Sequence, residues 1–233
     1  MTRRKEVAVM SRAKTEPAVD RDVRVAVGDI HLEGELKVPA GAKGIVLFAH
    51  GSGSSRHSPR NQFVARVIRD AGVGTLLFDL LTREEEAVDV MTRHLRFDID
   101  LLARRLTDAA RGIAAEPDTR SLRVGLFGSS TGGAAALVAA AELDKTIGAV
   151  VSRGGRPDLA GPALARVVSP TQLIVGGRDD VVLKLNEQAY ERLLCEKELK
   201  VVPGATHLFE EPGTLEEVAR LAAEWFNRHL QPM

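Results

Sequence analysis

Cysteine, net charge and long apolar runs are all scarce in this chain. Cys195 is the only cysteine among 233 residues, which excludes an internal disulfide framework and a cysteine-rich metal site and favours a reducing compartment. Basic and acidic residues balance at 32 each, so net charge provides no attraction to nucleic acid or anionic lipid. No apolar stretch approaches the about 20 residues that span a bilayer. We therefore expect a cytoplasmic protein with no metal, cofactor, nucleic-acid or membrane partner.

The first 22 residues lack the features of both a signal peptide and a folded element. Basic residues at 3–5 are followed by further charges, with no apolar segment of the kind a signal peptide requires. We expect residues 1–22 to form a flexible N-terminal tail. The remaining residues, 23–233, have the size of one α/β domain, and no internal linker or repeat divides them.

The spacing of apolar residues predicts the strands. Residues 23–27 and 30–38 alternate apolar and polar side chains around Gly28-Asp29, which predicts an antiparallel hairpin. Mainly apolar runs then predict parallel strands, which lie at 44–49, 73–78, 123–127, 147–151 and 171–175, and a last strand is expected at 199–202. The fold class is therefore α/β, with a doubly wound, mostly parallel eight-stranded sheet that begins with an antiparallel hairpin.

Helical spacing fills the intervals between these runs. Helices are expected at 59–71, from the turn around Ser130 as far as 143, near 162–168, at 182–194 and at 214–230. Between 80 and 117 a charged stretch, 83–86, precedes one long amphipathic helix. We interpret the charged stretch as a solvated face.

One turn in the chain has the pattern G-x-S-x-G. Gly128-Ser129-Ser130-Thr131-Gly132 follows a buried strand and begins an alanine-rich helix, the setting in which this motif exposes a nucleophilic serine. Only Ser130 fits the register. The alternative is a turn of small residues that merely packs a helix on a sheet. The motif predicts that Ser130 is the nucleophile of an acyl-transfer enzyme.

A nucleophilic serine needs a base and a group that orients the base. His207 follows the last predicted strand, at the carboxyl edge of the sheet, and is the predicted base. His50 also ends a strand, but it precedes the serine and is interpreted as shaping a loop. Asp179 and Asp180 follow the strand at 171–175. We choose Asp179 as the orienting acid, since Asp180 suits the first turn of the next helix.

Acyl transfer also requires donors for the developing oxyanion. Thr131, the residue after the nucleophile, should provide one backbone N–H, and Ser52 in the glycine-containing loop after 44–49 should provide the other. Gly51 and Gly53 also imitate a dinucleotide-binding turn. That interpretation ranks last, because Arg56 occupies the position of the third glycine and the loop to the helix is too long.

Serine, acid and histidine in this order at three strand ends give the chain a family resemblance. It resembles the α/β-hydrolase superfamily, and within it the small, lidless esterases similar to dienelactone hydrolase, over nearly all of 23–230. The resemblance implies an eight-stranded sheet with the triad on its carboxyl edge and an acyl-enzyme that water hydrolyses. Dienelactone hydrolases proper use a cysteine nucleophile, whereas here the position holds Ser130. Carboxylesterase is therefore the safer expectation.

The interval between the strands at 147–151 and 171–175 is too short for an inserted cap domain. An open cleft and few aromatics favour small, soluble esters as substrates. An amide, peptide or thioester hydrolase with the same triad, or a non-catalytic binding protein on the same fold, remains an alternative. Five arginines in predicted loops either attract an anionic substrate or serve solubility: Arg56, Arg60, Arg153, Arg156 and Arg178. Of these, Arg56 and Arg153 are the candidate substrate-binding residues. The sequence carries no signal for an oligomeric state.

Overall fold

The computed structural model describes residues 17–231 and contains one eight-stranded sheet. The strand order is β1-β2-β4-β3-β5-β6-β7-β8. β1 (Pro17–Val27) and β2 (Ile30–Pro39) form the predicted antiparallel hairpin, and β2 also pairs antiparallel with β4 (Gly74–Phe78). All other neighbours are parallel. The predicted fold class, an α/β-hydrolase fold, is confirmed.

The first strand is longer than the sequence predicted. β1 begins at Pro17, and Asp20, Arg21 and Asp22 pair with residues of β2. Assigning 17–22 to a tail was therefore wrong. At the outer edge of the sheet these charged side chains can stay in solvent while their backbone pairs, so their polarity did not indicate a loop. The rest of the expected tail, 1–16, and the final residues 232–233 lie outside the described residues.

The parallel strands make up the sheet from β4 to the edge strand β8. They are β3 (Gly44–Ala49), β4, β5 (Arg123–Ser129), β6 (Ile147–Arg153), β7 (Thr171–Gly176) and β8 (Lys197–Val202). Every residue of β3, β4, β6 and β7 is buried. The continuous apolar runs follow from this, because helices cover both faces of the sheet.

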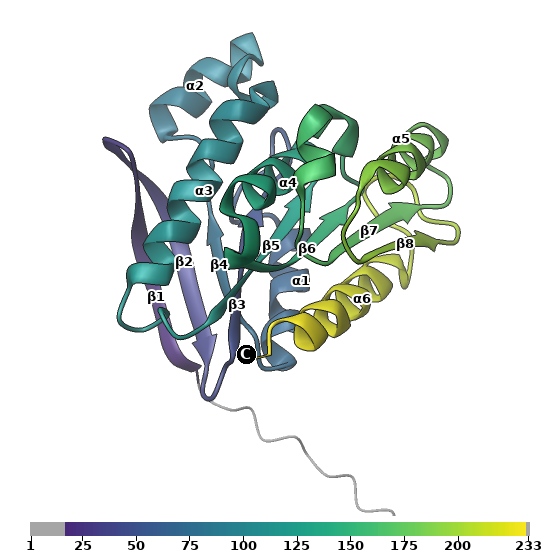
Figure 1. Ribbon diagram of the computed structural model, residues 1–233. Helices are drawn as coiled ribbons and strands as arrows, with labels where there is room; N and C mark the ends of the chain where they lie inside the picture. Colours follow the sequence, from purple (N-terminus) through teal and green to yellow (C-terminus); the bar gives the residue numbers. More distant parts are fainter. Residues whose placement is uncertain (1–16, 232–233) are drawn as a thin grey trace, which may run out of the picture.

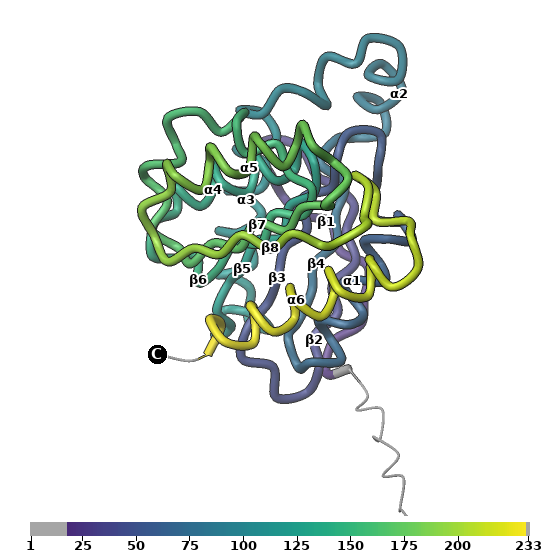
Figure 2. Tube along the Cα trace, turned by 90° about the vertical axis from the view of Figure 1, so that its right-hand side faces the viewer, coloured from purple at the N-terminus to yellow at the C-terminus, as the bar shows by residue number. Residues whose placement is uncertain are grey.

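Helices form a layer on each face (Figures 1 and 2). α1 (Pro59–Asp70) and α6 (Thr214–His229) lie together on one face. α3 (Ile99–Ala115), α4 (Thr131–Leu143) and α5 (Asp180–Arg192) cover the other face with a short 3₁₀ segment, η3 (Pro157–Arg166). Only η3 separates β6 from β7, so no cap domain is inserted there. None of the described helices combines the length and apolarity that a bilayer crossing requires.

The charged stretch after β4 forms a helix that the sequence analysis missed. α2 (Arg83–Thr92) begins with a capping box in which the Thr82 hydroxyl and the Glu85 carboxylate each accept from the other's backbone N–H. The Glu85 carboxylate also accepts hydrogen bonds from both terminal nitrogens of Arg105 in α3. Only one residue of α2 is buried, so the helix has no apolar stripe. It projects above the carboxyl edge of the sheet in Figure 1.

Candidate active site

Ser130 stands on a sharp turn between β5 and α4. Its backbone has φ 52° and ψ −121°, a left-handed conformation that residues other than glycine rarely adopt. Two hydrogen bonds from the neighbouring strand region hold the turn. The Ser130 N–H donates to the Arg153 carbonyl at 3.3 Å, and the Arg156 N–H donates to the Ser130 carbonyl at 3.0 Å. The half-buried side chain lines a cleft at the carboxyl edge of the sheet.

Two glycines permit this turn by bringing backbones close together. A Cβ at Gly128 would overlap the carbonyl of Gly132, and a Cβ at Gly132 would overlap the carbonyl of Ala49 at the end of β3. Both motif glycines are therefore required by packing, since any side chain would separate α4 from β3 and β5.

His207 and Asp179 meet from two different strand ends. The Nδ1 of His207 lies 2.7 Å from the Oδ2 of Asp179. The loops that carry them are joined by the Arg178 N–H, which donates to the Ala205 carbonyl at 2.9 Å. Asp179 directly precedes α5, whereas Asp180 is the first residue of that helix and is exposed. The structure therefore places Asp179, and not its neighbour, against the histidine.

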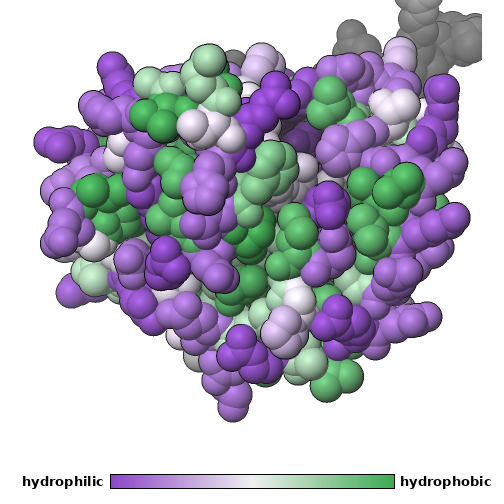
Figure 3. All heavy atoms as spheres, turned by 90° about the horizontal axis from the view of Figure 1, so that it is seen from above, coloured by the Kyte–Doolittle hydropathy of each residue, from purple (hydrophilic) through white to green (hydrophobic). Residues whose placement is uncertain are grey.

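Ser130 and His207 face the same cleft, which has a volume of about 830 Å³. The loop after β3 and the start of α1 form its other side, and residues after β4 close one end. The carboxyl edge, seen from above in Figure 3, carries mainly hydrophilic side chains with separate apolar patches between them. Within residues 17–231, no three histidine, cysteine, aspartate or glutamate side chains cluster as metal ligands would.

The two residues expected to stabilise an oxyanion lie next to each other. Ser52 Oγ is 3.1 Å from Thr131 Oγ1 and donates to the Arg96 carbonyl at 3.2 Å. Thr131 is the first residue of α4, so its backbone lies at the positive end of the helix dipole. The loop after β3 thus contacts the start of the helix that follows Ser130. The order of these segments in the sequence does not indicate this contact.

His50 holds the loop that carries Ser52. Its Nε2 accepts a hydrogen bond from the Leu80 N–H, so its Nδ1 carries the proton and donates to the Gly51 carbonyl, both at 3.0 Å. Burial lowers the pKa of His50, and this outweighs the opposing effects of the Gly51 carbonyl, Asp79 and Glu86. Because both ring nitrogens of the neutral His50 are hydrogen-bonded to backbone groups, His50 fixes the conformation of this loop.

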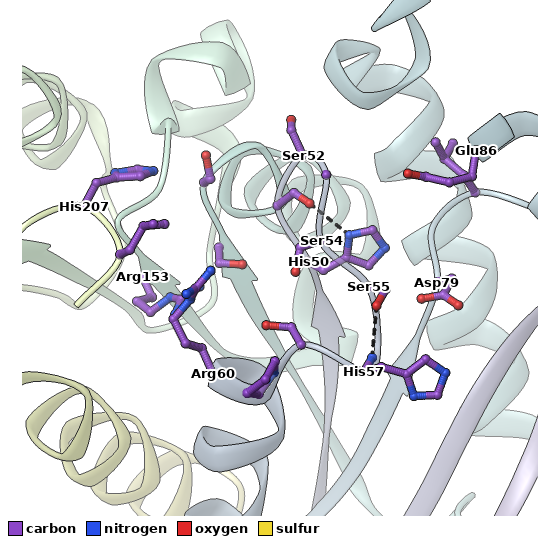
Figure 4. A pocket seen from close by; sticks show the side chains of 18 of the residues that line it. His50, Ser52, Ser54, Ser55, His57, Arg60, Asp79, Glu86, Arg153 and His207 are labelled. Carbon is purple, nitrogen blue, oxygen red and sulfur yellow. Dashed lines mark hydrogen bonds between the residues drawn. The ribbon is translucent and has the colours of Figure 1, made fainter. Parts of the chain in front are cut away.

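Two arginines project into the cleft beside His207. Arg153 ends β6 and is only 8 % exposed, and Arg60 is the second residue of α1. Figure 4 shows the Arg153 side chain between those of His207 and Arg60. Burial lowers the pKa of Arg153 to about 10, with a further contribution from the charge of Arg60. Arg153 therefore remains a cation at neutral pH.

The other loop arginines have different surroundings. The Arg56 guanidinium pairs with Asp79 and, at 2.7 Å, with Glu33, and its backbone N–H also donates to Asp79. Arg156 forms a two-pronged pair with Asp158. Arg178 is exposed. Of the five arginines, Arg60 and Arg153 are the two that line the cleft among the described residues.

Cys195 lies away from the cleft. It precedes β8, and since β8 is parallel to its neighbour, this position is at the edge of the sheet opposite Ser130. Burial raises the pKa of its thiol, and its Sγ lies 3.7 Å from Thr171 Oγ1. A protonated, partly buried thiol is a poor nucleophile.

The chain matches one protein-family model and two curated proteins. The family model described as the dienelactone hydrolase family matches residues 32–233. Two Mycobacterium tuberculosis proteins, from strains CDC 1551 and H37Rv, are each 57 % identical over 225 residues, or 97 % of this chain. Both are provisionally named phosphoribosyl transferases. The chain spans about half (50 %) of the length of these curated relatives.

Solved structures agree with the family model. A crystal structure of dienelactone hydrolase from Anabaena variabilis is 60 % identical, with a TM-score of 0.91 over 92 % of this chain and 99 % of that one. A dienelactone hydrolase-like promiscuous phosphotriesterase from metagenomic libraries is 20 % identical, with a TM-score of 0.73 over 91 % and 98 %, and shares the fold. The serine turn, the family model and the Anabaena structure lead to one conclusion: this chain belongs to the dienelactone hydrolase family.

Proposed function

We propose that this chain is a serine hydrolase that cleaves carboxylic esters of small, soluble substrates. Ser130 is the nucleophile, His207 the general base and acid, and Asp179 the group that orients His207. The observation that carries the proposal is the 2.7 Å contact between His207 Nδ1 and Asp179 Oδ2 in a cleft that Ser130 also lines.

The chemistry follows from this pairing. A carboxylate at Nδ1 keeps the proton there and leaves Nε2 free to act as a base. Nε2 takes the proton of Ser130 as Oγ attacks the ester carbonyl carbon, and then gives it to the departing alcohol oxygen. In the resulting acyl-enzyme, His207 then deprotonates a water that attacks the same carbon, the bond from that carbon to Ser130 Oγ breaks, and His207 returns the proton to Oγ as the acid is released.

The oxyanion formed in both steps requires nearby donors. We assign these to the backbone N–H groups of Ser52 and Thr131, whose side chains lie 3.1 Å apart. Each such donor contributes about 3 kcal/mol to transition-state stabilisation. The position of Thr131 at the start of α4 supports this role, because the helix dipole favours negative charge there.

Covalent labelling tests the nucleophile. A fluorophosphonate should label the wild-type protein and fail to label Ser130→Ala, and the same variant should lose turnover of p-nitrophenyl acetate. Ser129→Ala is the matched control, since it removes the adjacent hydroxyl, and it should retain both. Labelling of Ser130→Ala at the wild-type rate would refute the assignment.

The identity of the bond is tested separately. A panel of activated esters, thioesters and amides with one acyl group should give the highest kcat/KM for the ester. A higher kcat/KM for the amide or the thioester would leave the proposed triad intact and change the proposed substrate class. The name of the mycobacterial relatives suggests phosphoribosyl transfer instead. Release of diphosphate from a phosphoribosyl diphosphate donor by this chain would favour that function.

A further inference from the structure

Arg153 is a buried cation that pairs with no residue of the described chain. Its Nε and Nη1 atoms are shielded from solvent and have no hydrogen-bond partner among residues 17–231. Residues 149 and 151 of the same strand face the apolar core under α1 and α6, and Arg153 continues this face to the end of β6. Unpaired charges are costly to bury, so charged side chains in such positions usually contact an opposite charge. Since no residue in 17–231 supplies that charge to Arg153, a ligand in the cleft is the source that fits.

Arg60 adds a second cation at the same place. Its charge is close enough to act on Arg153, and its own Nε is also buried without a partner among the described residues. Among the described residues one carboxylate forms an ion pair with these arginines: Glu210, 63 % exposed, accepts from Arg60 Nη1 at 3.0 Å. Asp79 and Glu86 also line the cleft, and Asp79 is paired with Arg56. His207 is the other titratable group beside Arg153, and its Nδ1 is already paired with Asp179. The charges around the two guanidinium groups therefore leave an excess of positive charge.

The N-terminus of α1 lies on the same side of the cleft. Its N-cap residue, Ser58, makes no side-chain cap hydrogen bond, and the first turn holds no acidic residue. Ser58 and Pro59 line the cleft together with Arg60. Uncapped N–H groups and the helix dipole favour an anion, and here they point to the same region as two arginines.

We propose that Arg153, Arg60 and the N-terminus of α1 form a subsite for a phosphate-type dianion carried by the substrate. A planar carboxylate can be satisfied by a single guanidinium fork, whereas a tetrahedral phosphate presents three oxygens to donors that arrive from different directions. Two cations and a helix N-terminus match the tetrahedral geometry of the phosphate and its double negative charge.

The subsite and the nucleophile lie in one cleft. Ser130, Arg153 and Arg60 all line it, and the Arg153 carbonyl accepts the hydrogen bond of the Ser130 N–H. One substrate can therefore present an ester to Ser130 and an anionic group to the two arginines. The identification of a substrate subsite rests on the proposed ester hydrolysis, whereas binding of phosphate itself does not.

Phosphate binding is the first test. Titration calorimetry of Ser130→Ala with inorganic phosphate, at a pH of about 8 where phosphate is mostly dianionic, should show one saturable site. Adding Arg153→Gln should weaken binding about 10-fold or more, and Arg60→Gln by a smaller factor. Glu210→Gln should strengthen it by removing the competing carboxylate. Arg104→Gln, which removes an exposed arginine of α3, is the matched control and should change nothing.

The overturning results are equally specific. Absence of saturable phosphate binding, or equal binding with and without Arg153 in variants that melt as the parent does, would refute the subsite. Acetate binding as tight as phosphate binding would show that the site accepts a carboxylate, and the dianion assignment would be wrong.

Three esters then connect the subsite to catalysis. The p-nitrophenyl esters of 3-phosphonopropanoic acid, succinic acid and butyric acid carry a dianion, a monoanion and no charge. The wild type should prefer them in that order in kcat/KM, and Arg153→Gln should lose about 10-fold or more on the phosphonate, less on the succinate and nothing on the butyrate. Equal losses on all three esters would refute a charge-recognition role. If no ester reacts but phosphate binds through Arg153, the ester hydrolysis is wrong and the anion site stands.

Discussion

The Nε2 of His50 accepts a hydrogen bond from the backbone N–H of Leu80 at 3.0 Å. This bond joins the end of β3 to the end of β4, and the Nδ1–H of the same ring holds the Gly51 carbonyl. The loop that carries Ser52 is thereby fixed from both strand ends. Protonation of His50 would destroy the acceptor at Nε2, so this arrangement requires a neutral ring.

The lowered pKa of His50 makes stability depend on pH. Burial holds the folded pKa below the ordinary value of 6.5, so the unfolded chain takes up this proton first as the pH falls. The contribution to stability is complete above about pH 6.5 and is lost as the pH falls through the folded pKa. Urea unfolding at about pH 7.5 and about pH 5.5 should show this loss in the wild type and a smaller one in His50→Gln. An equal loss in both proteins would contradict the role of His50.

The strained backbone of Ser130 predicts a gain in stability when the site is destroyed. A positive φ costs a side-chain-bearing residue about 1–3 kcal/mol, whereas glycine adds about 1 kcal/mol or less of unfolded-state entropy. Ser130→Gly should therefore unfold at a higher temperature than Ser130→Ala, by about 2–4 °C, and both variants should be inactive. Ser130→Ala keeps the Cβ and is the matched control. A lower melting temperature for Ser130→Gly would show that the turn is unstrained.

Asp179 and Asp180 should differ sharply in their effect on activity. Asparagine at 179 can donate to His207 Nδ1 and so favours the wrong tautomer, which should lower kcat by about four orders of magnitude. Asp180→Asn changes only the exposed first turn of α5 and should keep kcat within about 2-fold. Steady-state hydrolysis of p-nitrophenyl acetate measures both. A comparable loss in the two variants would remove Asp179 from its orienting role.

Gly132→Ala should destabilise the protein through backbone overlap. The new Cβ would meet the Ala49 carbonyl, which cannot move without disturbing β3, so we expect a loss of at least about 2 kcal/mol in the free energy of unfolding. Gly112→Ala is the matched control, because no atom lies within 4 Å of its Cβ position in α3. That variant should gain up to about 1 kcal/mol from helix propensity. Chemical denaturation separates the two.

Arg56 should affect stability more than substrate preference. Its guanidinium is already occupied by Asp79 and Glu33, so Arg56→Gln leaves the partly buried Asp79 carboxylate without its cation, while Glu33 keeps its pair with Arg83 at 3.0 Å. We expect a loss of about 1–3 kcal/mol in stability and the same relative kcat/KM for charged and neutral esters as the wild type. A selective rise in KM for anionic esters would instead place Arg56 in substrate binding.

Local sequence patterns were sufficient for the elements that form the centre of the sheet. β3, β4 and β7 are buried on both faces, so their apolar runs are continuous and identify them. α2 and the first half of β1 escaped prediction for the opposite reason. Both are polar and lie at the periphery, where a capping box or strand pairing stabilises the backbone without an apolar pattern.

The candidate residues of the site were predicted from the sequence, and the fold shows how they lie relative to one another. The order of Ser130, Asp179 and His207 at strand ends led to the prediction, because parallel strands bring their carboxyl ends to one edge of the sheet. The sequence also named Arg56 and Arg153 as equivalent loop cations. Only the tertiary structure separates them, since the partners of Arg56 come from β2 and the end of β4, whereas Arg153 is left unpaired beside Arg60. Which charges are neutralised depends on distances between elements remote in sequence, and no local pattern records those distances.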